Sequence, residues 1–398
     1  MRDYLPLAAA ARRSLADALL AAFERWGYRR IITPAFEYEE TLGRSSTVEM
    51  VRFVEPVTGE IVALRPDITP QVARLVATRL ADERGPIRLS YEGSVVRRSP
   101  VRELYQAGVE LIEAPSPAGD VEVIALAQAA LGQAGVADLT IDLGCASVAR
   151  AALDGISDEE LAHAIARKDA EATAERARAL QLPTARRKLV EALPSLYGGA
   201  EVIDRAAALV GKEGRASLRA LARIASQLDG GGRVTVDLGE VRGFDYYTGV
   251  RFQGFAPGVG DALVSGGRYD HLIERYGRAA RAAGFAIDVE RVADALRARG
   301  SAPTGNGGRG VYLAGDARRR RQVAAALRRA GARVAEHLDE RVGRDGEWSA
   351  LAKAAGMDCF VLLLADGGAR ATGGALSRKR LDGFLAGRVP LDALLGAS

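Results

Sequence analysis

The spacing of apolar residues near the N-terminus predicts an amphipathic helix. Leu15, Leu19, Leu20 and Phe23 fall on one helical face. Two arginines follow the preceding apolar stretch instead of leading it, so the segment lacks the order of a secretory signal peptide. No apolar run approaches the roughly 18 residues that a membrane-spanning helix needs, and we therefore expect no membrane association.

Strand patterns dominate the next part of the chain. They cover residues 29–33, 50–55, 60–64, 87–98, 104–113 and 139–143. Among them, Thr69 as N-cap and Pro70 at the first helical position predict a helix over 71–80, and residues 120–131 predict another. Short connections between consecutive strands are typical of an antiparallel sheet with helices packed on it.

The pattern becomes helical between residues 147 and 228 and then returns to strands. The helical stretch is rich in Ala, Arg and Leu, and it is broken at Pro183 and Pro194. Further strands are predicted at 234–238, 244–255 and 262–265, followed by helices near 269–276 and 289–299. The predicted fold class is therefore α+β, an antiparallel sheet flanked by helices, with a helical insertion at about 147–230.

A composition shift marks the end of this domain. Residues 303–310 are rich in Gly and Pro, which predicts a linker after a domain spanning 1–302. The GxGxxG pattern inside it precedes a strand, so a linker is favoured over a nucleotide-binding loop. Beyond it, strand and helix patterns alternate from residue 310 to 365, and they predict a small C-terminal α/β module over 311–398.

Charge and cysteine content narrow the functional classes. The 398 residues include 55 basic and 51 acidic side chains, a net charge of +4 that indicates no general commitment to nucleic acid. The arginines at 318–321 are interpreted as a solvated helix face. The two cysteines have neither metal-site nor disulfide spacing, and the three histidines are scattered, so we expect a cytoplasmic protein without a metal.

Polar residues occupy strand positions where apolar alternation is the ordinary pattern. Gln106, Gly108 and Glu110 share one face of a predicted strand, and the glycine is expected to leave room there for a ligand. Arginines that fork onto a carboxylate, acids that accept from an ammonium group and several tyrosines together suit an amino acid with a polar ring. Taken singly, each arginine is more often in a structural ion pair and each tyrosine in the core.

The motifs resemble those of histidyl-tRNA synthetases, which have the class II aminoacyl-tRNA synthetase fold. Segments 242–247 and 265–270 are similar to the two histidine-recognition motifs, and Pro34, Arg97 and Arg291 to the class II motif positions. The similarity covers about the first 300 residues. It implies that Asp67, Thr69 and Gln106 hold the α-amino group of histidine, that Arg97 and Arg242 face its carboxylate, and that Glu110, Tyr246, Tyr247 and Tyr269 complete the pocket around the imidazole.

Several positions depart from an active synthetase. Ser99 stands where the synthetases have an ATP-binding glutamate, and Asp288 stands where they have a glycine. An acidic side chain beside a triphosphate adds bulk and like-charge repulsion. The loop after Arg97 is short, and Asp67 replaces the usual glutamate of its motif. We therefore expect a degenerate ATP site at Ser99, Asp288 and Arg291, with no aminoacylation.

These departures are similar to those of a paralogous family, the regulatory subunits of ATP phosphoribosyltransferase. Segments 64–74 and 193–202 resemble that family closely. The resemblance implies a regulatory subunit with no catalytic residue and no cofactor, which partners a short-form catalytic subunit in the first step of histidine biosynthesis and mediates feedback by L-histidine. It also implies a self-dimer, formed through residues 27–40, within a hetero-oligomer, and makes tRNA an unexpected partner.

Two alternatives stay open at this point. Retention of Arg97, Arg242 and Arg291, together with the C-terminal module, would also suit an active histidyl-tRNA synthetase. A scaffold with a vestigial pocket, which stabilises its partner without binding histidine, is the third reading.

Overall fold

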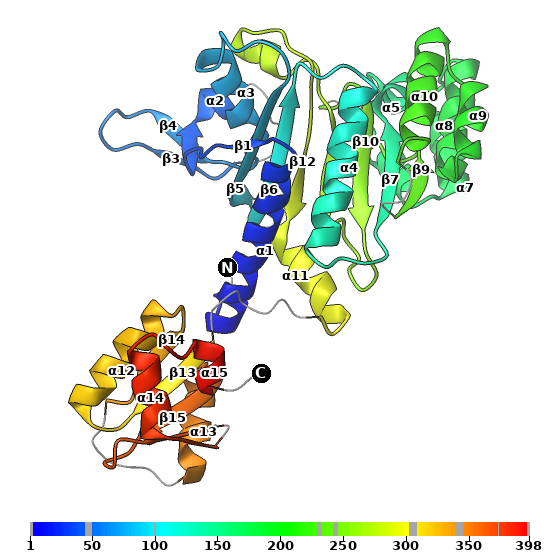
Figure 1. The fold of residues 1–398 in the computed structure, drawn as a ribbon. Coiled ribbons are helices and arrows are strands. Elements are labelled where there is room, and N and C mark those ends of the chain that lie inside the picture. Colours follow the sequence, from blue (N-terminus) through cyan, green and yellow to red (C-terminus); the bar gives the residue numbers. More distant parts are fainter. Residues whose placement is uncertain are drawn as a thin grey trace. The chain divides into compact units, whose positions relative to one another are not determined.

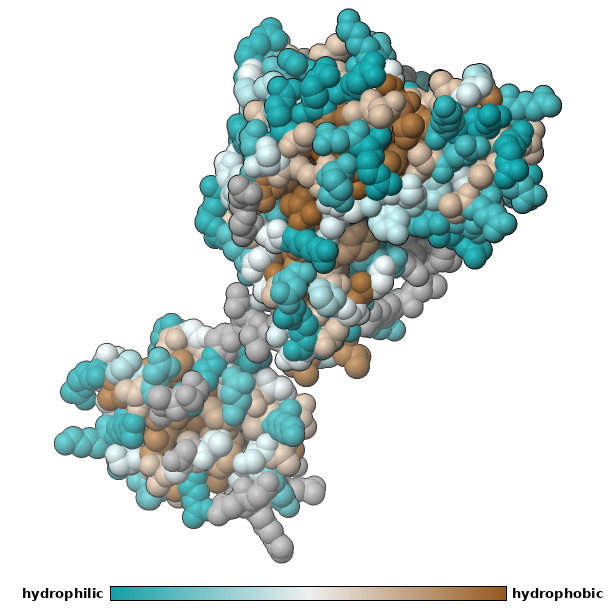
Figure 2. Space-filling view, turned by 90° about the vertical axis from the view of Figure 1, so that its right-hand side faces the viewer, coloured by the Kyte–Doolittle hydropathy of each residue, from teal (hydrophilic) through white to brown (hydrophobic). Residues whose placement is uncertain are grey.

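The computed structural model describes residues 3–43, 50–98, 101–228, 232–241, 246–301, 309–338, 345–372 and 374–395. The chain divides into two compact units, Met1–Thr304 and Gly305–Ser398. Most of the predicted linker at 303–310 lies outside the described residues. Figure 2 shows hydrophilic side chains over much of the visible face of the first unit, with apolar residues exposed in patches among them.

A nine-stranded sheet forms the centre of the first unit (Figure 1). Its strands are β1 (Arg29–Arg30), β5 (Ile87–Arg98), β6 (Val101–Ile112), β7 (Thr140–Cys145), β8 (Tyr197–Gly198), β9 (Arg233–Asp237), β10 (Val250–Phe255), β11 (Val264–Arg268) and β12 (Ala282–Asp288). Their order is β1-β5-β6-β12-β11-β10-β7-β9-β8. Among these described strands, β1 with β5 and β7 with β9 pair in parallel, and the other neighbours are antiparallel.

Three helices cover one face of this sheet, as Figure 1 shows. They are α1 (Pro6–Arg25), α4 (Ala118–Gln133) and α11 (Val289–Ala298), which pack on one another and on β6 and β12. The amphipathic helix predicted near the N-terminus is confirmed, because Leu15, Leu19, Leu20 and Phe23 are all buried. The ring of Phe23 meets Phe285 of β12 edge to face, with 5.7 Å between centroids.

A smaller sheet and a helix lie beside the main sheet. The small sheet has the order β2-β4-β3, with β2 (Phe36–Tyr38), β3 (Arg52–Val54) and β4 (Ile61–Leu64). Its β3–β4 pair is the predicted hairpin. It is followed by α3 (Thr69–Thr78), and α2 (Glu39–Gly43) contacts both. The N-cap prediction is wrong: the helix already includes Thr69, and the N-cap residue is Ile68, which has no polar side-chain atom. The Thr69 hydroxyl bonds to Glu110 instead of capping the helix.

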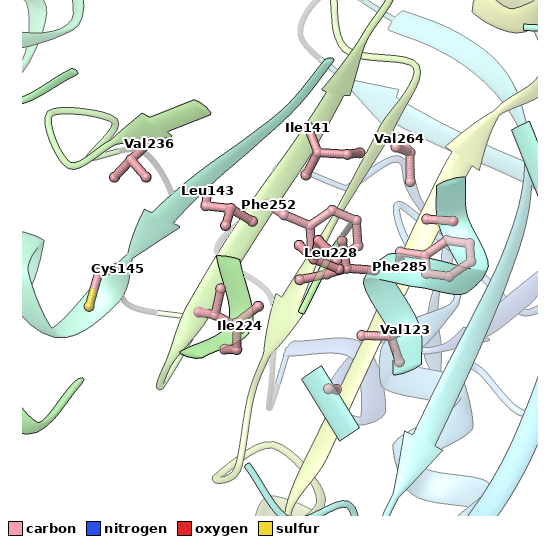
Figure 3. Close-up of a cluster of buried hydrophobic side chains, with 14 of the residues drawn as sticks. Val123, Ile141, Leu143, Cys145, Ile224, Leu228, Val236, Phe252, Val264 and Phe285 are labelled. Atoms are coloured by element: carbon pink, nitrogen blue, oxygen red, sulfur yellow. The ribbon is translucent and has the colours of Figure 1, made fainter. Parts of the chain in front are cut away.

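The helical insertion is tied into the main sheet and its core. Its helices are α5 (Ala146–Leu153), α6 (Glu159–Ala166), α7 (Ala170–Ala179), α8 (Thr184–Ala192), the 3-10 helix η1 (Leu193–Ser195), α9 (Glu201–Ala207) and α10 (Lys212–Ala225). Between η1 and α9 the insertion supplies strand β8, which pairs with β9. Ile224 and Leu228 share one buried cluster with Leu143 of β7 and Phe252 of β10 (Figure 3).

Three sequence predictions near residues 244–288 need correction. Strand β10 begins at Val250, so the described residues 246–249 are not part of the strand that was expected over 244–255. A short 3-10 helix, η2 (Ile273–Tyr276), replaces the helix expected from residue 269. Strand β12 was not predicted at all. Four of the seven residues of β12 are Ala or Gly and only Ile287 is β-branched, so the sequence carries little strand signal.

The second unit contains a five-stranded sheet of order β14-β13-β15-β16-β17. Its elements are β13 (Gly310–Ala314), α12 (Ala317–Arg329), β14 (Arg333–Glu336), α13 (Asp345–Ala354), β15 (Cys359–Leu363), β16 (Ala369–Ala371), β17 (Gly374–Leu376), α14 (Arg378–Leu385) and α15 (Leu391–Leu395). The alternation predicted over 310–365 is confirmed, whereas the later elements were not predicted. None of the described helices combines the length and apolar composition that crossing a bilayer requires.

Candidate functional site

A cavity of about 140 Å³ lies over β6, β11 and β12 in the first unit. A volume of this order is similar to that of engineered cavities that hold a benzene-sized ring. The cavity brings together the sequence-predicted residues Asp67, Thr69, Arg97, Gln106, Glu110, Tyr246, Tyr247, Tyr269, Asp288 and Arg291. Two further predicted residues, Ser99 and Arg242, lie outside the described residues. The predicted pocket residues that the structure describes thus line one cavity.

Glu110 lies at the buried floor of this cavity and is only 1% exposed. Its carboxylate accepts hydrogen bonds from the Thr69 hydroxyl at 2.6 Å, from Tyr91 at 3.3 Å and from Tyr269. Burial raises the pKa of Glu110 to about 8, the nearby Asp67 adds to this shift, and the hydroxyl donors oppose it. An acid with so high a pKa in a cleft is typical of a functional site.

Tyr91 is a site residue that the sequence did not reveal. It pairs across the sheet with Gly108, and a Cβ built on that glycine would lie 2.5 Å from the Tyr91 hydroxyl. The space above Gly108 is therefore filled by Tyr91, which corrects the expectation that this glycine leaves room for a ligand. Because paired residues share one face of a sheet, the ring crosses the glycine and its hydroxyl reaches Glu110.

Gly284 is a second residue that the sequence analysis did not place in the pocket. It faces Glu110 across the β6–β12 pair, and a Cβ at this position would lie 1.8 Å from the Glu110 carboxylate. No side chain fits there without displacing the acid. A glycine inside a strand is the available signal for such close approach, but here the strand itself was not predicted.

Two polar atoms near the cavity have no hydrogen-bond partner among the described residues. They are the hydroxyl of Tyr246 and the side-chain carbonyl of Gln106, and both are buried. The Tyr246 ring lies against Tyr269 and Tyr247, with centroid separations of 5.5 and 5.1 Å. Since buried polar groups are nearly always hydrogen-bonded, these two atoms are candidates for hydrogen bonds to a ligand in the cavity.

Arg65 holds the loop that presents Asp67 and Thr69. Its guanidinium is buried and donates to the backbone carbonyls of Ser94 at 2.7 Å and Thr33 at 2.9 Å. The same group also reaches the carbonyl of Pro34 at 3.1 Å. Arg65 does not line the cavity, so it fixes the geometry of the loop and does not itself offer a charge to a ligand.

At Asp288 and Arg291 the charged groups satisfy one another. The Asp288 carboxylate caps helix α11 by accepting from the Arg291 backbone N–H at 3.0 Å, and it lies 3.3 Å from the Arg291 guanidinium. That guanidinium also contacts the carboxylate of Asp261 at 3.2 Å and the carbonyl of Ala262 at 2.9 Å. Burial raises the pKa of Asp288. No cluster among the described residues could hold a metal ion.

Comparison with known proteins identifies the family. The family model of histidyl-tRNA synthetase matches residues 1–292. An ATP phosphoribosyltransferase regulatory subunit of Syntrophotalea carbinolica is 42% identical over 74% of this chain and 73% of its own length. One from Pseudomonas aeruginosa is 35% identical over 90% of this chain and 93% of its own.

The solved structures agree with this assignment. A protein of Bacillus halodurans, described as an ATP phosphoribosyltransferase regulatory subunit/histidyl-tRNA synthetase, superposes with a TM-score of 0.74 at 30% identity, covering 88% of this chain and 94% of its own. The predicted family and fold class are both confirmed. The chain belongs to the ATP phosphoribosyltransferase regulatory subunits, a family of regulatory, non-catalytic proteins built on the histidyl-tRNA synthetase fold.

Proposed function

We propose that this chain binds L-histidine in the described cavity and confers activity and histidine feedback on a short-form ATP phosphoribosyltransferase catalytic subunit. The observation that carries the proposal is the lining of the cavity, which combines the buried Glu110 with the unpartnered polar atoms of Tyr246 and Gln106. The N–H group of an imidazole ring can donate a hydrogen bond to a carboxylate at this position.

The arrangement of charges suits the rest of the amino acid as well. Asp67 and Gln106 can accept from an ammonium group, and Arg97 can pair with a carboxylate. Arg242, proposed for the same carboxylate, keeps that role as a prediction. The amino acid would thus be held by its ammonium group, its carboxylate and its ring. Of these three contacts, the one to the ring distinguishes histidine from other amino acids.

Aminoacylation is not part of the proposal. Arg291 is already paired with Asp288 and Asp261, so a triphosphate would have to displace two carboxylates from it. Asp288 is also fixed as the cap of α11, and its charge would repel a phosphate. An active histidyl-tRNA synthetase is the second candidate, supported by the family model that matches the first 292 residues.

Two assays on the purified full chain test the proposal. Isothermal titration should show saturable L-histidine binding, and histidine-dependent exchange of pyrophosphate into ATP should be absent. Adding the chain to a short-form catalytic subunit should raise phosphoribosyltransferase activity and make it sensitive to histidine. Clear pyrophosphate exchange would establish the synthetase instead, and partner activation without histidine binding would establish the scaffold. Because coupling is reciprocal, the catalytic subunit should also change the histidine affinity.

A self-dimer is the second part of the proposal. The small β2-β4-β3 sheet exposes large apolar side chains, including Phe36 at 49% and Phe53 at 42%, whose rings contact each other. Exposed apolar clusters of this kind mark interaction surfaces. Phe36→Ser with Phe53→Ser should give a monomer in sedimentation velocity, whereas Leu351→Ser, in the second unit, should not. An unchanged dimer in the double variant would refute this surface.

A cytoplasmic location is also proposed. Cys145 and Cys359 are both free and buried, which suits a compartment that keeps thiols reduced.

A further inference from the structure

The buried acid Glu110 and the arginines of the cavity lie at different positions along the sheet. Glu110 faces Gly284 across the β6–β12 pair, and Gln106 faces Asp288 four residues away, about 13 Å along the strand. Arg97 pairs with Arg102 of β6, still farther from Glu110 in the same direction. The cavity therefore has an acidic end at Glu110 and a basic end, which holds Arg97 and the paired Asp288 and Arg291.

The groups that face Glu110 are hydroxyls and another acid. From α3, β5 and the end of β11 come the hydroxyls of Thr69, Tyr91 and Tyr269, and β12 contributes only Gly284. The loop before α3 adds the carboxylate of Asp67, and the hydroxyls of Tyr246, Tyr247 and Tyr28 are further titratable neighbours. No cationic side chain among the described residues is hydrogen-bonded to Glu110.

We infer that the cavity binds histidine with its ring protonated, as an imidazolium paired with the Glu110 carboxylate. The inference rests on the proposed histidine binding and specifies which ionic form of the ligand the site selects. The ligand then carries three charges, and each has an opposite partner: ammonium with Asp67, imidazolium with Glu110 and carboxylate with Arg97.

The three hydroxyls favour this form. Thr69 and Tyr91 donate to one oxygen of Glu110 and Tyr269 donates to the other. A proton on either oxygen would make that oxygen a weaker acceptor, so three donors favour the carboxylate. A carboxylate that is buried without a cationic partner is strongly disfavoured, and an imidazolium supplies that partner. Binding of the ammonium group beside Asp67 also offsets the repulsion between the two acids, which further favours the ionised Glu110.

The proton balance is closed within the complex at neutral pH. In the free protein the pKa of Glu110 is raised to about 8, so at pH 7 the carboxyl holds a proton while the ring of free histidine, with a pKa of about 6.5, is mostly neutral. On binding, the carboxyl O–H bond breaks and a ring N–H bond forms. Below about pH 6 the ring brings its own proton and one is released; above about pH 8 one is taken up. Affinity should be greatest between these limits.

The test uses the full chain and a ring-fluorinated histidine, 2-fluorohistidine, whose ring does not protonate at neutral pH. Isothermal titration at pH 7 with L-histidine comes first and tests the proposed function alone. The fluorinated analogue should then bind about 100-fold more weakly. In Glu110→Gln, which keeps the shape of the side chain but cannot become an anion, histidine and the analogue should bind within about threefold of each other.

Nitrogen-15 NMR of labelled histidine bound to the unmodified chain gives an independent measure of the ring's protonation. Both ring nitrogens should show the imidazolium pattern at pH 7. A neutral-ring pattern, or an analogue that binds the unmodified chain as well as histidine does, would overturn the inference while leaving histidine binding intact. A chain that does not bind histidine at all refutes the proposed function and this inference with it.

Discussion

The acidic and basic ends of the cavity are built on opposite principles. At the acidic end, Glu110 is buried among hydroxyls, and the hydroxyl of Tyr246 lacks a partner within the described structure. At the basic end, Asp288 and Arg291 already neutralise each other. Polar groups without protein partners can bond to a ligand at little cost, whereas charges that already pair with each other must first be separated. This difference supports the proposed binding of an amino acid, and not of a nucleotide, in a synthetase-like cavity.

The strongest way to break this comparison is to fill the acidic end. In Gly284→Ala, the added Cβ would lie 1.8 Å from the Glu110 carboxylate, so the acid must move or the strands must separate. We expect histidine binding to fall below detection in isothermal titration, and overpacking to lower the free energy of unfolding by about 1–3 kcal/mol. Gly132→Ala, where a Cβ meets no atom within 4 Å, is the matched control. Normal binding in Gly284→Ala would contradict the described geometry.

Removing the acid itself should have the next largest effect. In Glu110→Ala the hydroxyls of Thr69, Tyr91 and Tyr269 lose their acceptor and the ring of histidine loses its partner. A buried polar group left unpaired costs about 1–3 kcal/mol, so affinity should fall about 10- to 100-fold. Titration calorimetry measures this loss, and circular dichroism should show a folded chain. Unchanged affinity would mean that Glu110 does not contact the ligand.

The raised pKa of Glu110 predicts a pH dependence of stability that sharpens the comparison. The folded state holds the proton up to about pH 8, whereas the unfolded chain loses it near pH 4.5. Stability therefore falls as pH rises between these values, by at most about 1.4 kcal/mol per pH unit, and levels off above pH 8. Urea unfolding of the unliganded chain at pH 5, 6.5 and 8 should show this decline. Glu110→Gln should lack that part of it, and parallel profiles for the two proteins would refute the assignment.

The smallest effect is expected at the basic end. Asp288→Ala removes the side-chain cap of α11, which should lower the free energy of unfolding by about 1 kcal/mol in urea titration. Histidine affinity should change less than threefold, because the carboxylate is engaged with Arg291. A loss as large as that of Glu110→Ala would show that both ends take part in histidine binding, and the contrast between them would fail.

Local patterns predicted the fold well where side chains alternate clearly or form a helical stripe. Strand β5 was predicted with its observed bounds, and α1 from its buried stripe, because their packing repeats with the period of the element. Strand β12 was missed because the need for small residues in it comes from side chains of neighbouring strands, which local sequence does not show. Only a glycine at position 284 leaves space for the Glu110 carboxylate, and Glu110 belongs to a strand far away in the sequence.

The site shows the same division. Resemblance to a family of known motifs selected most of the residues that line the cavity. The resemblance did not select Tyr91, which lies behind Glu110. A single tyrosine in a strand is usually a core residue, and only the register that sets Tyr91 over Gly108 gives it a role. The prediction that Thr69 caps a helix failed for a similar reason. Its sequence context suits an N-cap, but its hydroxyl donates to the buried carboxylate of Glu110 instead.

Strand β8 has a consequence for the helical insertion as a whole. This edge strand of the main sheet has only two residues. Lys168 of the insertion also contacts the neighbouring β9, where its Nζ lies 2.6 Å from the Asp237 carboxylate. Without the insertion, β9 would present unpaired backbone groups, a template for pairing with other chains. The insertion thus protects the sheet against aggregation, so an attempt to trim this protein to a minimal pocket would first have to redesign an exposed edge.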